Sequence, residues 1–395
     1  MQIQTWLFLL LPIAALSGWL LARRHYKRRY KKTDSAFNPA YFKGLNYLLN
    51  EQPDKAIDVF IGLLEVNSET VETHLALANL FRRRGETERA IRIHQNLIAR
   101  PSLHGLQRTQ AMIELGLDYM HAGVLDRAEH LFLELLQLPS PPPEAARQLL
   151  RIYQQEKKWQ RAIEMAKLMD GHKQDNVQPL IAHFYCELAE QSLNFDRHES
   201  LNLIQLALFH DDNCVRASLL EARLQLSMSQ PQKALKALQN IERQDQNFLP
   251  EAMPLLYQAY QHTANLAAFR NWLQQLIQRH PQLTSARLML TKLIDELEGG
   301  PPAQQFLYEE LHHYPSVEGL HTLINLGENS EIALVPLIHQ ITGAMVHRGD
   351  RYTCKNCGFS GKTLHWLCPG CARWATIRPT EIHLSAIEKL LDTRR

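Results

Sequence analysis

Asp54-Lys55-Ala56-Ile57-Asp58-Val59-Phe60 begins a pattern that the chain repeats at regular distances. Related segments occupy residues 88–94, 126–132 and 160–166, and two weaker ones align at Ser200 and Ala234. The small residue of the first four segments lies at Ala56, Ala90, Ala128 and Ala162, at intervals of 34, 38 and 34 residues. A period close to 34 residues is typical of arrays in which each unit is a pair of helices.

Two other positions recur in phase with these alanines. Twelve residues earlier lies a small or apolar residue (Gly44, Ala78, Gly116, Leu150), and nine earlier lies an aromatic one (Tyr47, Phe81, Tyr119, Tyr153). Small residues let two helices approach closely, and the rings fill the space toward the next unit. The pattern resembles the tetratricopeptide repeat, which implies a mostly α fold of helix pairs stacked into a right-handed superhelix. We expect six such units and two or three divergent ones, the latter marked by Tyr260 with Pro281 and by Ala303 with Pro315.

The N-terminus joins an uncharged segment to a basic one. Residues 6–22 carry no charge, and counting from Ile3 gives about twenty residues, enough to span a bilayer core of roughly 30 Å as a helix. A cleaved signal peptide would need positive charge before its apolar stretch. Here the charge follows, because residues 23–32 hold seven Lys or Arg and no acid. The positive-inside rule therefore predicts an uncleaved transmembrane anchor with a cytoplasmic body, and the basic residues would attract anionic membrane lipid.

The net charge of +2 conceals this asymmetry. Because residues 23–32 contribute seven positive charges, residues 33–395 carry a net charge of −5. A nucleic-acid-binding protein would usually spread positive charge over its folded face. We therefore expect no nucleic-acid partner.

The C-terminal region holds Cys354-Lys-Asn-Cys357 and Cys368-Pro-Gly-Cys371, two Cys-x-x-Cys pairs separated by ten residues. Four thiolates so placed predict one tetrahedral site for zinc or iron. Disulfides are disfavoured because the remainder of the chain indicates a reducing compartment. His365 is a weaker competing ligand, and Cys186 and Cys214 are expected in the core of the helices. We expect three short strands here, with aromatic residues packing on the last repeat.

Three uses of this metal module are open. It is a structural or protein-binding zinc ribbon, a rubredoxin-type electron carrier, or a nucleic-acid-binding ribbon. The two pairs match rubredoxin knuckles, but rubredoxins separate them by a longer segment. Metal analysis of anaerobically purified protein discriminates between the first two uses, because zinc excludes electron transfer.

A partner-binding groove is predicted on the first helices of the repeats. Its candidate residues are Asn79, Arg82 and Arg83 of the second unit and Arg147, Arg151 and Gln154 of the fourth. Guanidinium groups in such a groove would suit an acidic or carboxylate-bearing peptide. The alternative, that these arginines form an ordinary solvated surface, stays open.

Catalytic motifs are not found in the sequence. It contains no phosphate-binding loop, no Gly-x-Gly-x-x-Gly, no Gly-x-Ser-x-Gly and no His-Glu-x-x-His. Since repeats, anchor and ribbon occupy nearly the whole chain, little length is left for a catalytic domain. We expect no enzyme activity and no catalytic residue.

Longer segments carry a resemblance that extends over the whole chain. They are Leu80–Glu86 running into Arg89–Gln95, then Ile181–Ala189, and finally Arg351–Phe359. With the ordered combination of anchor, basic tract, repeats and ribbon, they resemble the lipopolysaccharide assembly protein B family of Gram-negative bacteria. The implied organisation is a transmembrane anchor (1–22), a basic juxtamembrane linker (23–36), a repeat array (37–345), a rubredoxin-like metal ribbon (346–380) and a tail (381–395).

The resemblance also implies a function. Family members are inner-membrane adaptors that regulate lipopolysaccharide biosynthesis. In that membrane, the N-terminus that the positive-inside rule puts outside would be periplasmic. They act with the membrane protease FtsH to promote degradation of the LpxC deacetylase, and they gather other lipopolysaccharide assembly proteins. By match to the family, Cys354, Cys357, Cys368 and Cys371 bind the metal, and the ribbon packs against the repeats. A general scaffold without a role in proteolysis and a membrane-linked electron carrier remain alternatives.

Overall fold

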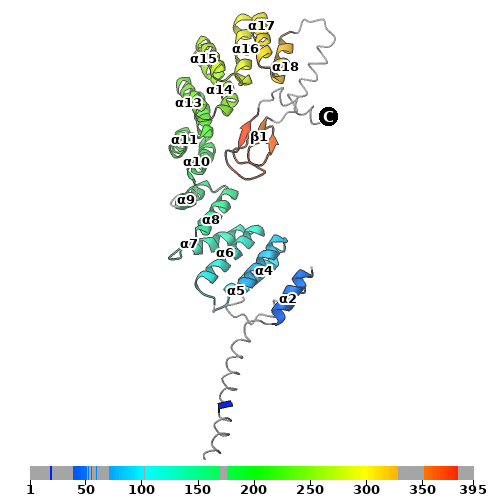
Figure 1. Cartoon of the computed structure of the whole chain (residues 1–395). Coiled ribbons are helices and arrows are strands. Elements are labelled where there is room, and N and C mark those ends of the chain that lie inside the picture. The colour runs from blue at the N-terminus through cyan, green and yellow to red at the C-terminus, as the bar shows by residue number, and fades with distance from the viewer. Residues whose placement is uncertain are drawn as a thin grey trace, which may run out of the picture. The chain divides into compact units, whose positions relative to one another are not determined.

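The computed structural model describes residues 39–50, 71–101, 103–169, 176–327 and 351–380, with isolated positions at 18–19, 52, 55 and 59. Helices fill the first four ranges and a small sheet lies in the last, so the mostly α prediction is confirmed (Figure 1). The chain divides into two compact units, residues 1–145 and 146–395. The anchor predicted over residues 1–22 falls almost wholly outside the described residues. Within those ranges, no helix combines the length and apolarity needed to cross a bilayer.

The first unit is built from antiparallel helix pairs. Its helices are α2 (Pro39–Leu49), α4 (Val71–Arg83), α5 (Thr87–Ile98), α6 (Gly105–His121) and α7 (Leu125–Leu136), and α8 (Pro143–Gln155) begins at its end. Helix α5 packs on both α4 and α6, and α6 packs on α7. Thus α4–α5 and α6–α7 are the pairs predicted from Ala90 and Ala128.

Close packing explains the periodic small residues. Ala90 and Ala128 are fully buried. A Cβ atom added at Gly116 of α6 would lie only 2.5 Å from Cζ of Phe132 in α7. Glycine at position 116 therefore lets the Phe132 ring lie against the α6 backbone.

A recurring cation–π contact, which the sequence pattern did not predict, joins the two helices of a pair. The basic residue before the repeat alanine lies over the aromatic ring of the same helix pair, so Arg89 covers Phe81 at 6.0 Å and Arg127 covers Tyr119 at 5.7 Å. Cation–π contacts at exposed sites contribute about 0.5–1 kcal/mol each. The recurring Arg-Ala dipeptide thus has a role for each of its residues.

The turn between the two helices of a pair contains one residue with positive φ. This residue lies five positions before the position of the repeat alanine. Gly85 and Gly123 have φ of 82° and 75° there. Lys157, Ser229 and Ala264 occupy the same register with φ of 57°, 57° and 52°. A residue with a side chain pays about 1 kcal/mol or more to adopt this left-handed conformation. The packing of the two flanking helices must therefore offset that cost at the turns without glycine.

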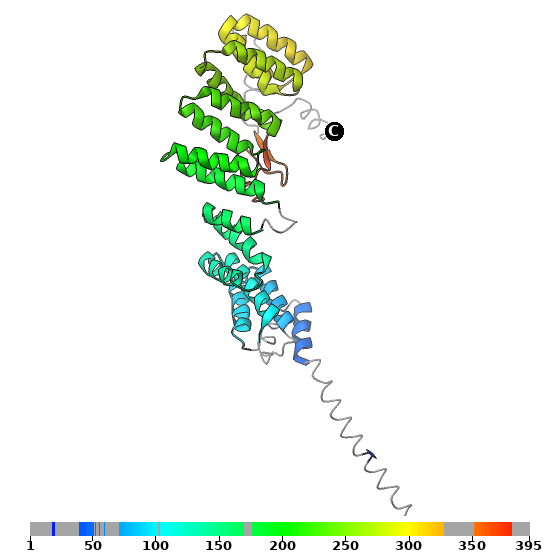
Figure 2. The same cartoon turned by 90° about the vertical axis from the view of Figure 1, so that its left-hand side faces the viewer.

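The second unit continues the helix pairs and carries the sheet. After α8 come α9 (Trp159–Met169), α10 (Gln178–Ser192), α11 (Arg197–His210), α12 (Val215–Ser227), α13 (Pro231–Gln244), the short 3₁₀ helix η2 (Gln246–Phe248), α14 (Leu249–His262), α15 (Leu266–Arg279), α16 (Thr284–Glu298), α17 (Gly300–His313) and α18 (Val317–Leu326). Figure 2 shows these helices from a second side. A continuous core from Val215 to Ala303 joins α12 through α17. The divergent repeats predicted around Tyr260 and Ala303 correspond to α14–α15 and α16–α17.

The ribbon, described here over residues 351–380, forms the three short strands that were predicted. Strand β1 (Tyr352–Cys354) lies between β2 (Ser360–Gly361) and β3 (Ile377–Pro379), and both pairings are antiparallel. Its own buried core contains only Tyr352, Cys354, Cys368 and Ile377. So small a core is rarely stable without a metal or a neighbouring surface.

Candidate metal centre and its contacts with the helices

The four ribbon cysteines meet at one point. Their sulfur atoms all lie within 4.8 Å of one another, with Cys354 and Cys371 3.8 Å apart and Cys357 and Cys368 3.7 Å apart. A tetrahedral ion with metal–sulfur bonds near 2.3 Å requires sulfur–sulfur edges of about 3.8 Å. The donor set therefore fits one tetrathiolate-bound ion, zinc or iron.

The two knuckles have the same turn. In each, the residue four positions after the first cysteine has positive φ, 76° at Gly358 and 51° at Ala372. The backbone N–H of that residue donates to the carbonyl oxygen of the first cysteine, at 3.0 Å and 2.9 Å respectively. This turn folds both cysteines of a pair toward the same point.

Hydrogen bonds to sulfur favour the thiolate form on one side of the site. The hydroxyl of Thr376, 3.3 Å from Cys354 Sγ, lowers the pKa of Cys354 to about 6. Against the effect of burial, the Asn356 side chain lowers the pKa of Cys371. The Phe359 N–H favours the Cys357 thiolate, but partial loss of water around the sulfur and the three neighbouring thiols raise the pKa of Cys357 to about 12. Four adjacent thiolates thus need a cation, which is the chemistry a bound metal supplies.

Two ribbon tryptophans lie against the helices of the second unit. Trp374 stacks on His183 at 5.1 Å and meets the edges of Phe184 and Trp159 at 5.8 and 6.2 Å. The guanidinium of Arg216 lies over the Trp374 ring at 5.9 Å. Trp366 stacks on Phe248 at 5.4 Å and also contacts His183.

Polar contacts accompany these rings. Tyr352 Oη donates to Glu251 at 2.5 Å, and Arg378 forms an ion pair with Asp245 at 2.9 Å. The Arg378 guanidinium also lies 4.8 Å from the centre of the Phe248 ring. The expectation that the ribbon packs on the repeats holds, but these contacts lie on α9, α10, α12, η2 and α14, and not on the last repeat.

His183 is neutral under this ribbon. Burial, with the charges of Arg216 and Arg378, lowers the pKa of His183 to about 3. Arg216 is itself almost wholly buried and paired with Glu187 at 2.9 Å and Glu190 at 3.0 Å. An uncharged imidazole can stack on Trp374 without adding a second positive charge beside Arg216.

The predicted groove residues fall in both units. Arg82 pairs with Glu114 at 2.6 Å and Asp118 at 2.8 Å, and Asp118 is also bonded to the buried His94 at 2.5 Å. Arg82 therefore links α4 to α6, a role that the sequence reading missed although Glu114 and Asp118 share one face of α6. The other candidates are exposed (Arg83, Arg151) or half-buried (Asn79, Arg147, Gln154). No observation tests their binding of a partner, so the groove stays a prediction.

The remaining cysteine and histidine predictions can be placed. Cys186 and Cys214 are buried among the helices, which confirms the expected core positions. His365 lies outside the sulfur cluster and is hydrogen-bonded to Thr363 at 2.9 Å.

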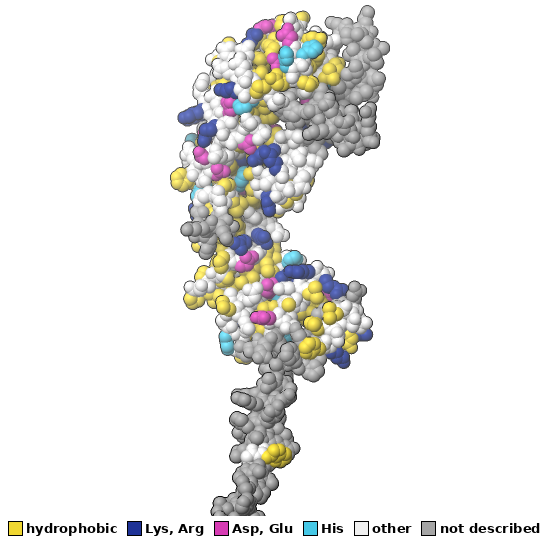
Figure 3. Space-filling view, in the orientation of Figure 1, with side chains coloured by type: hydrophobic (Ala, Val, Ile, Leu, Met, Phe, Trp, Pro, Cys, Tyr) yellow, Lys and Arg dark blue, Asp and Glu magenta, His cyan; other side chains and the backbone are white. Residues whose placement is uncertain are grey.

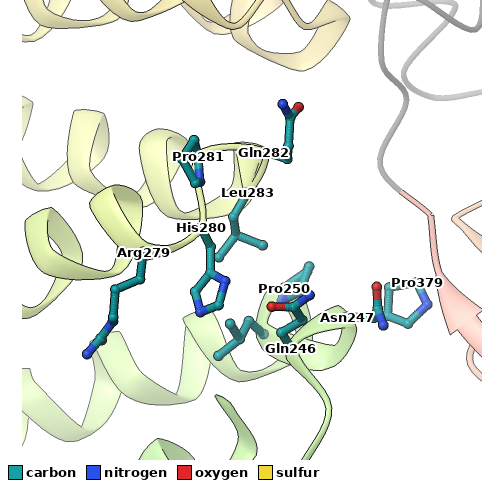
Figure 4. Close-up of a pocket in the computed structure, with 10 residues that line it drawn as sticks. Gln246, Asn247, Pro250, Arg279, His280, Pro281, Gln282, Leu283 and Pro379 are labelled. Atoms are coloured by element: carbon teal, nitrogen blue, oxygen red, sulfur yellow. The ribbon is translucent and has the colours of Figure 1, made fainter. Parts of the chain in front are cut away.

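A pocket of about 360 Å³ lies where the ribbon meets the helices (Figure 4). Pro379 of β3 forms one wall, and residues of η2, α14 and the α15–α16 connection form the others. Arg279 and His280, which also line it, both pair with Glu242, at 3.1 and 2.9 Å. Because these charges are balanced within the protein, the pocket does not favour a charged ligand. Charged side chains of both signs are likewise interspersed on the face of α9–α18 seen in Figure 3.

Comparison with known proteins agrees with this geometry. Residues 352–379 match the family described as rubredoxin metal binding domain, and residues 73–104 match the tetratricopeptide repeat. Lipopolysaccharide assembly protein B of Escherichia coli (strain K12) is 36% identical over 381 residues, covering 94% of this chain and 97% of that protein. The chain belongs to the lipopolysaccharide assembly protein B family. The Haemophilus influenzae member is 35% identical over 392 residues, again covering 94% of this chain and 97% of its own length.

Among solved structures, Naa15/Naa10 bound to HypK-THB aligns with 79% of this chain and 47% of its own. The TM-score is 0.45 and the sequence identity 13%. This likeness adds nothing to the helix pairs already described. Family membership confirms the resemblance on which the sequence reading rested.

Proposed function

We propose that this protein is a membrane-tethered, non-enzymatic adaptor in lipopolysaccharide assembly. Similarity over nearly the full length to members named for that process carries the proposal. The helix pairs support it, because stacked repeats offer long surfaces for protein partners. An anchor over residues 1–22 would place the body at the cytoplasmic face of the inner membrane and raise its effective concentration near membrane enzymes.

The finer proposal is that the adaptor promotes degradation of the LpxC deacetylase by FtsH. In this scheme one surface engages the protease, or a protein beside it, and the candidate groove residues of the second unit, Arg147, Arg151 and Gln154, hold the substrate. The metal ribbon is a folding centre and part of the binding surface, and it carries no electrons. Zinc in the purified protein would support this role, whereas a reversible iron couple would support the electron carrier.

Deacetylase half-life in cells tests the finer proposal. Without the protein the half-life should lengthen severalfold, and the full chain should restore rapid turnover. A chain lacking residues 1–22 should fold but fail to restore it. Normal turnover with that truncation would contradict the tethering scheme.

The word assembly in the names of the relatives favours a second candidate, a scaffold that gathers lipopolysaccharide enzymes without acting in proteolysis. The two candidates differ in two readouts. A scaffold would leave deacetylase half-life unchanged, and it would capture the enzymes equally well in the presence or absence of the protease.

A further inference from the structure

The four ligand residues are unequally covered by protein. Cys354 and Cys368 are only 2% and 1% exposed, and Cys371 is half-buried. Cys357 is exposed. An external reagent therefore meets Cys357 before it meets the other ligands.

Side-chain contacts reinforce this difference. Cys354 Sγ is bonded to the Thr376 hydroxyl at 3.3 Å and accepts the Asn356 backbone N–H at 3.4 Å. The Asn356 side chain reaches Cys371 and is itself held by Arg373 at 2.8 Å. Thr376, beyond the second knuckle, thus supports Cys354 of the first, and the Asn356 side chain of the first knuckle supports Cys371 of the second.

Glycine at position 370 keeps the second knuckle from covering the Cys357 sulfur with a side chain. A Cβ atom built on Gly370 would lie 3.2 Å from Cys357 Sγ. On the neighbouring turn, a Cβ on Gly358 would meet nothing within 4 Å. The Pro-Gly turn of the second knuckle therefore approaches this sulfur without shielding it.

We propose that Cys357 is the ligand at which soft electrophiles and peroxides open the metal centre. With an alkyl halide, the sulfur forms a bond to carbon and halide leaves. With hydrogen peroxide, the sulfur attacks one oxygen, hydroxide leaves, and Cys357 becomes a sulfenic acid.

The sulfenic acid has a nearby thiolate with which to react. Cys368 Sγ, 3.7 Å away, attacks the Cys357 sulfur, forms a disulfide and expels hydroxide. Two thiolates, one peroxide and two protons thus give one disulfide and two waters. The ion, left with only Cys354 and Cys371, dissociates. The ribbon then loses the ion on which its small core depends, so Cys357 would couple thiol-reactive stress to the ribbon's contacts with the helices.

The test is a limited reaction of the full-length, zinc-loaded protein with iodoacetamide, followed by digestion with trypsin. Cleavage at Lys and Arg places Cys354 and Cys357 in separate peptides, 352–355 and 356–362, whereas Cys368 and Cys371 share 363–373 and are resolved by fragmentation. At less than one label per protein, Cys357 should be modified about tenfold faster than Cys354 or Cys368. Zinc release, followed with a chelating dye, should match Cys357 labelling one to one.

Two further arms support or overturn the proposal. Gly370→Ala should slow Cys357 labelling severalfold at full zinc content, whereas the matched Gly361→Ala, whose Cβ would meet only the Phe359 ring at 3.6 Å, should not. Peroxide should link peptide 356–362 to 363–373 through Cys357 and Cys368. Three outcomes would overturn the proposal: first labelling at Cys354 or Cys368, equal labelling of all four ligands, and zinc release without modified Cys357. They do so even if Gly370→Ala loses its zinc, because all three are measured on the wild-type protein.

Discussion

At the scale of single residues, the metal ligands were predictable and their supporting groups were not. Cysteine spacing alone identified Cys354, Cys357, Cys368 and Cys371, because a tetrahedral ion restricts where the ligands can lie in sequence. Thr376 reaches the sulfur of Cys354, and the Asn356 side chain reaches that of Cys371, because the two turns bring distant parts of the ribbon together. No spacing rule marks a threonine or an asparagine for that role.

Thr376→Val should weaken the site without removing a ligand. Valine has the shape of threonine but cannot hydrogen-bond to Cys354 Sγ, so we expect zinc affinity to fall about tenfold or more. Competition with a chelating dye measures this change. Thr376→Ser keeps the hydroxyl and should stay near the wild-type affinity, and a serine variant as weak as the valine variant would show that packing, not the hydrogen bond, matters.

His183 should make the folded second unit sensitive to acid. Its pKa is lowered from 6.5 to about 3 in the folded protein, by burial and by the charges of Arg216 and Arg378. Between these two values the unfolded chain binds a proton that the folded chain does not. The free energy of unfolding therefore decreases as pH falls from about 6.5 toward 3, by at most about 1.4 kcal/mol for each pH unit.

Denaturant unfolding of His183→Gln at several pH values checks this prediction. The variant should lose that part of the pH dependence, whereas His198→Gln, an exposed control on α11, should keep it. Parallel curves for wild type and His183→Gln would contradict the assignment.

At the scale of helices, the sequence predicted which helices form pairs, but it did not predict the backbone conformation of the turns between them. Periodic alanines and aromatics identify the pairs because close helix contact needs both a small residue and a ring to fill the next space. The left-handed turns at Lys157 and Ser229 carry no glycine, so only the packing of the flanking helices reveals them. The Arg82–Asp118–His94 network was also missed, since its members come from three different helices.

Gly116→Ala tests the close contact of α6 with α7. The added methyl would lie 2.5 Å from Phe132, so the ring or a helix must shift. Such overpacking costs about 1–3 kcal/mol. Thermal or denaturant unfolding should show this loss, and adding Phe132→Leu should recover part of it. A Gly116→Ala protein as stable as the wild type would mean that the two helices separate easily.

At the scale of the whole molecule, the order of parts was readable but the position of the ribbon was not. Aromatic residues in so small a module predicted that it packs on the helices. Which helices it contacts depends on the arrangement of repeats more than a hundred residues earlier in the chain. Arg216 and Glu251 had no signal in the sequence, because each looks like an ordinary charged residue of a helix.

Metal removal should release the ribbon and leave the repeats folded. The helices keep a core of their own from Val215 to Ala303, whereas two of the four buried residues in the ribbon core are metal ligands. Without the ion, Trp366 and Trp374 lose the fold that presents them to Phe248 and His183. We expect the helical circular dichroism to persist while trypsin cleavage after Lys355 and Lys362 accelerates strongly.

Trp374→Ala separates docking from metal binding. It should keep its zinc but lose contact with the helices worth less than the roughly 3–5 kcal/mol of a fully buried ring, because a large half-buried ring is removed. Trypsin should then cut the ribbon faster than in the wild type and more slowly than in metal-free protein. Tyr308→Ala, at an exposed ring on α17, is the matched control and should leave cleavage unchanged. Unaltered cleavage in both the metal-free protein and Trp374→Ala would mean that the ribbon is held by its polar contacts alone, namely Tyr352 with Glu251 and Arg378 with Asp245.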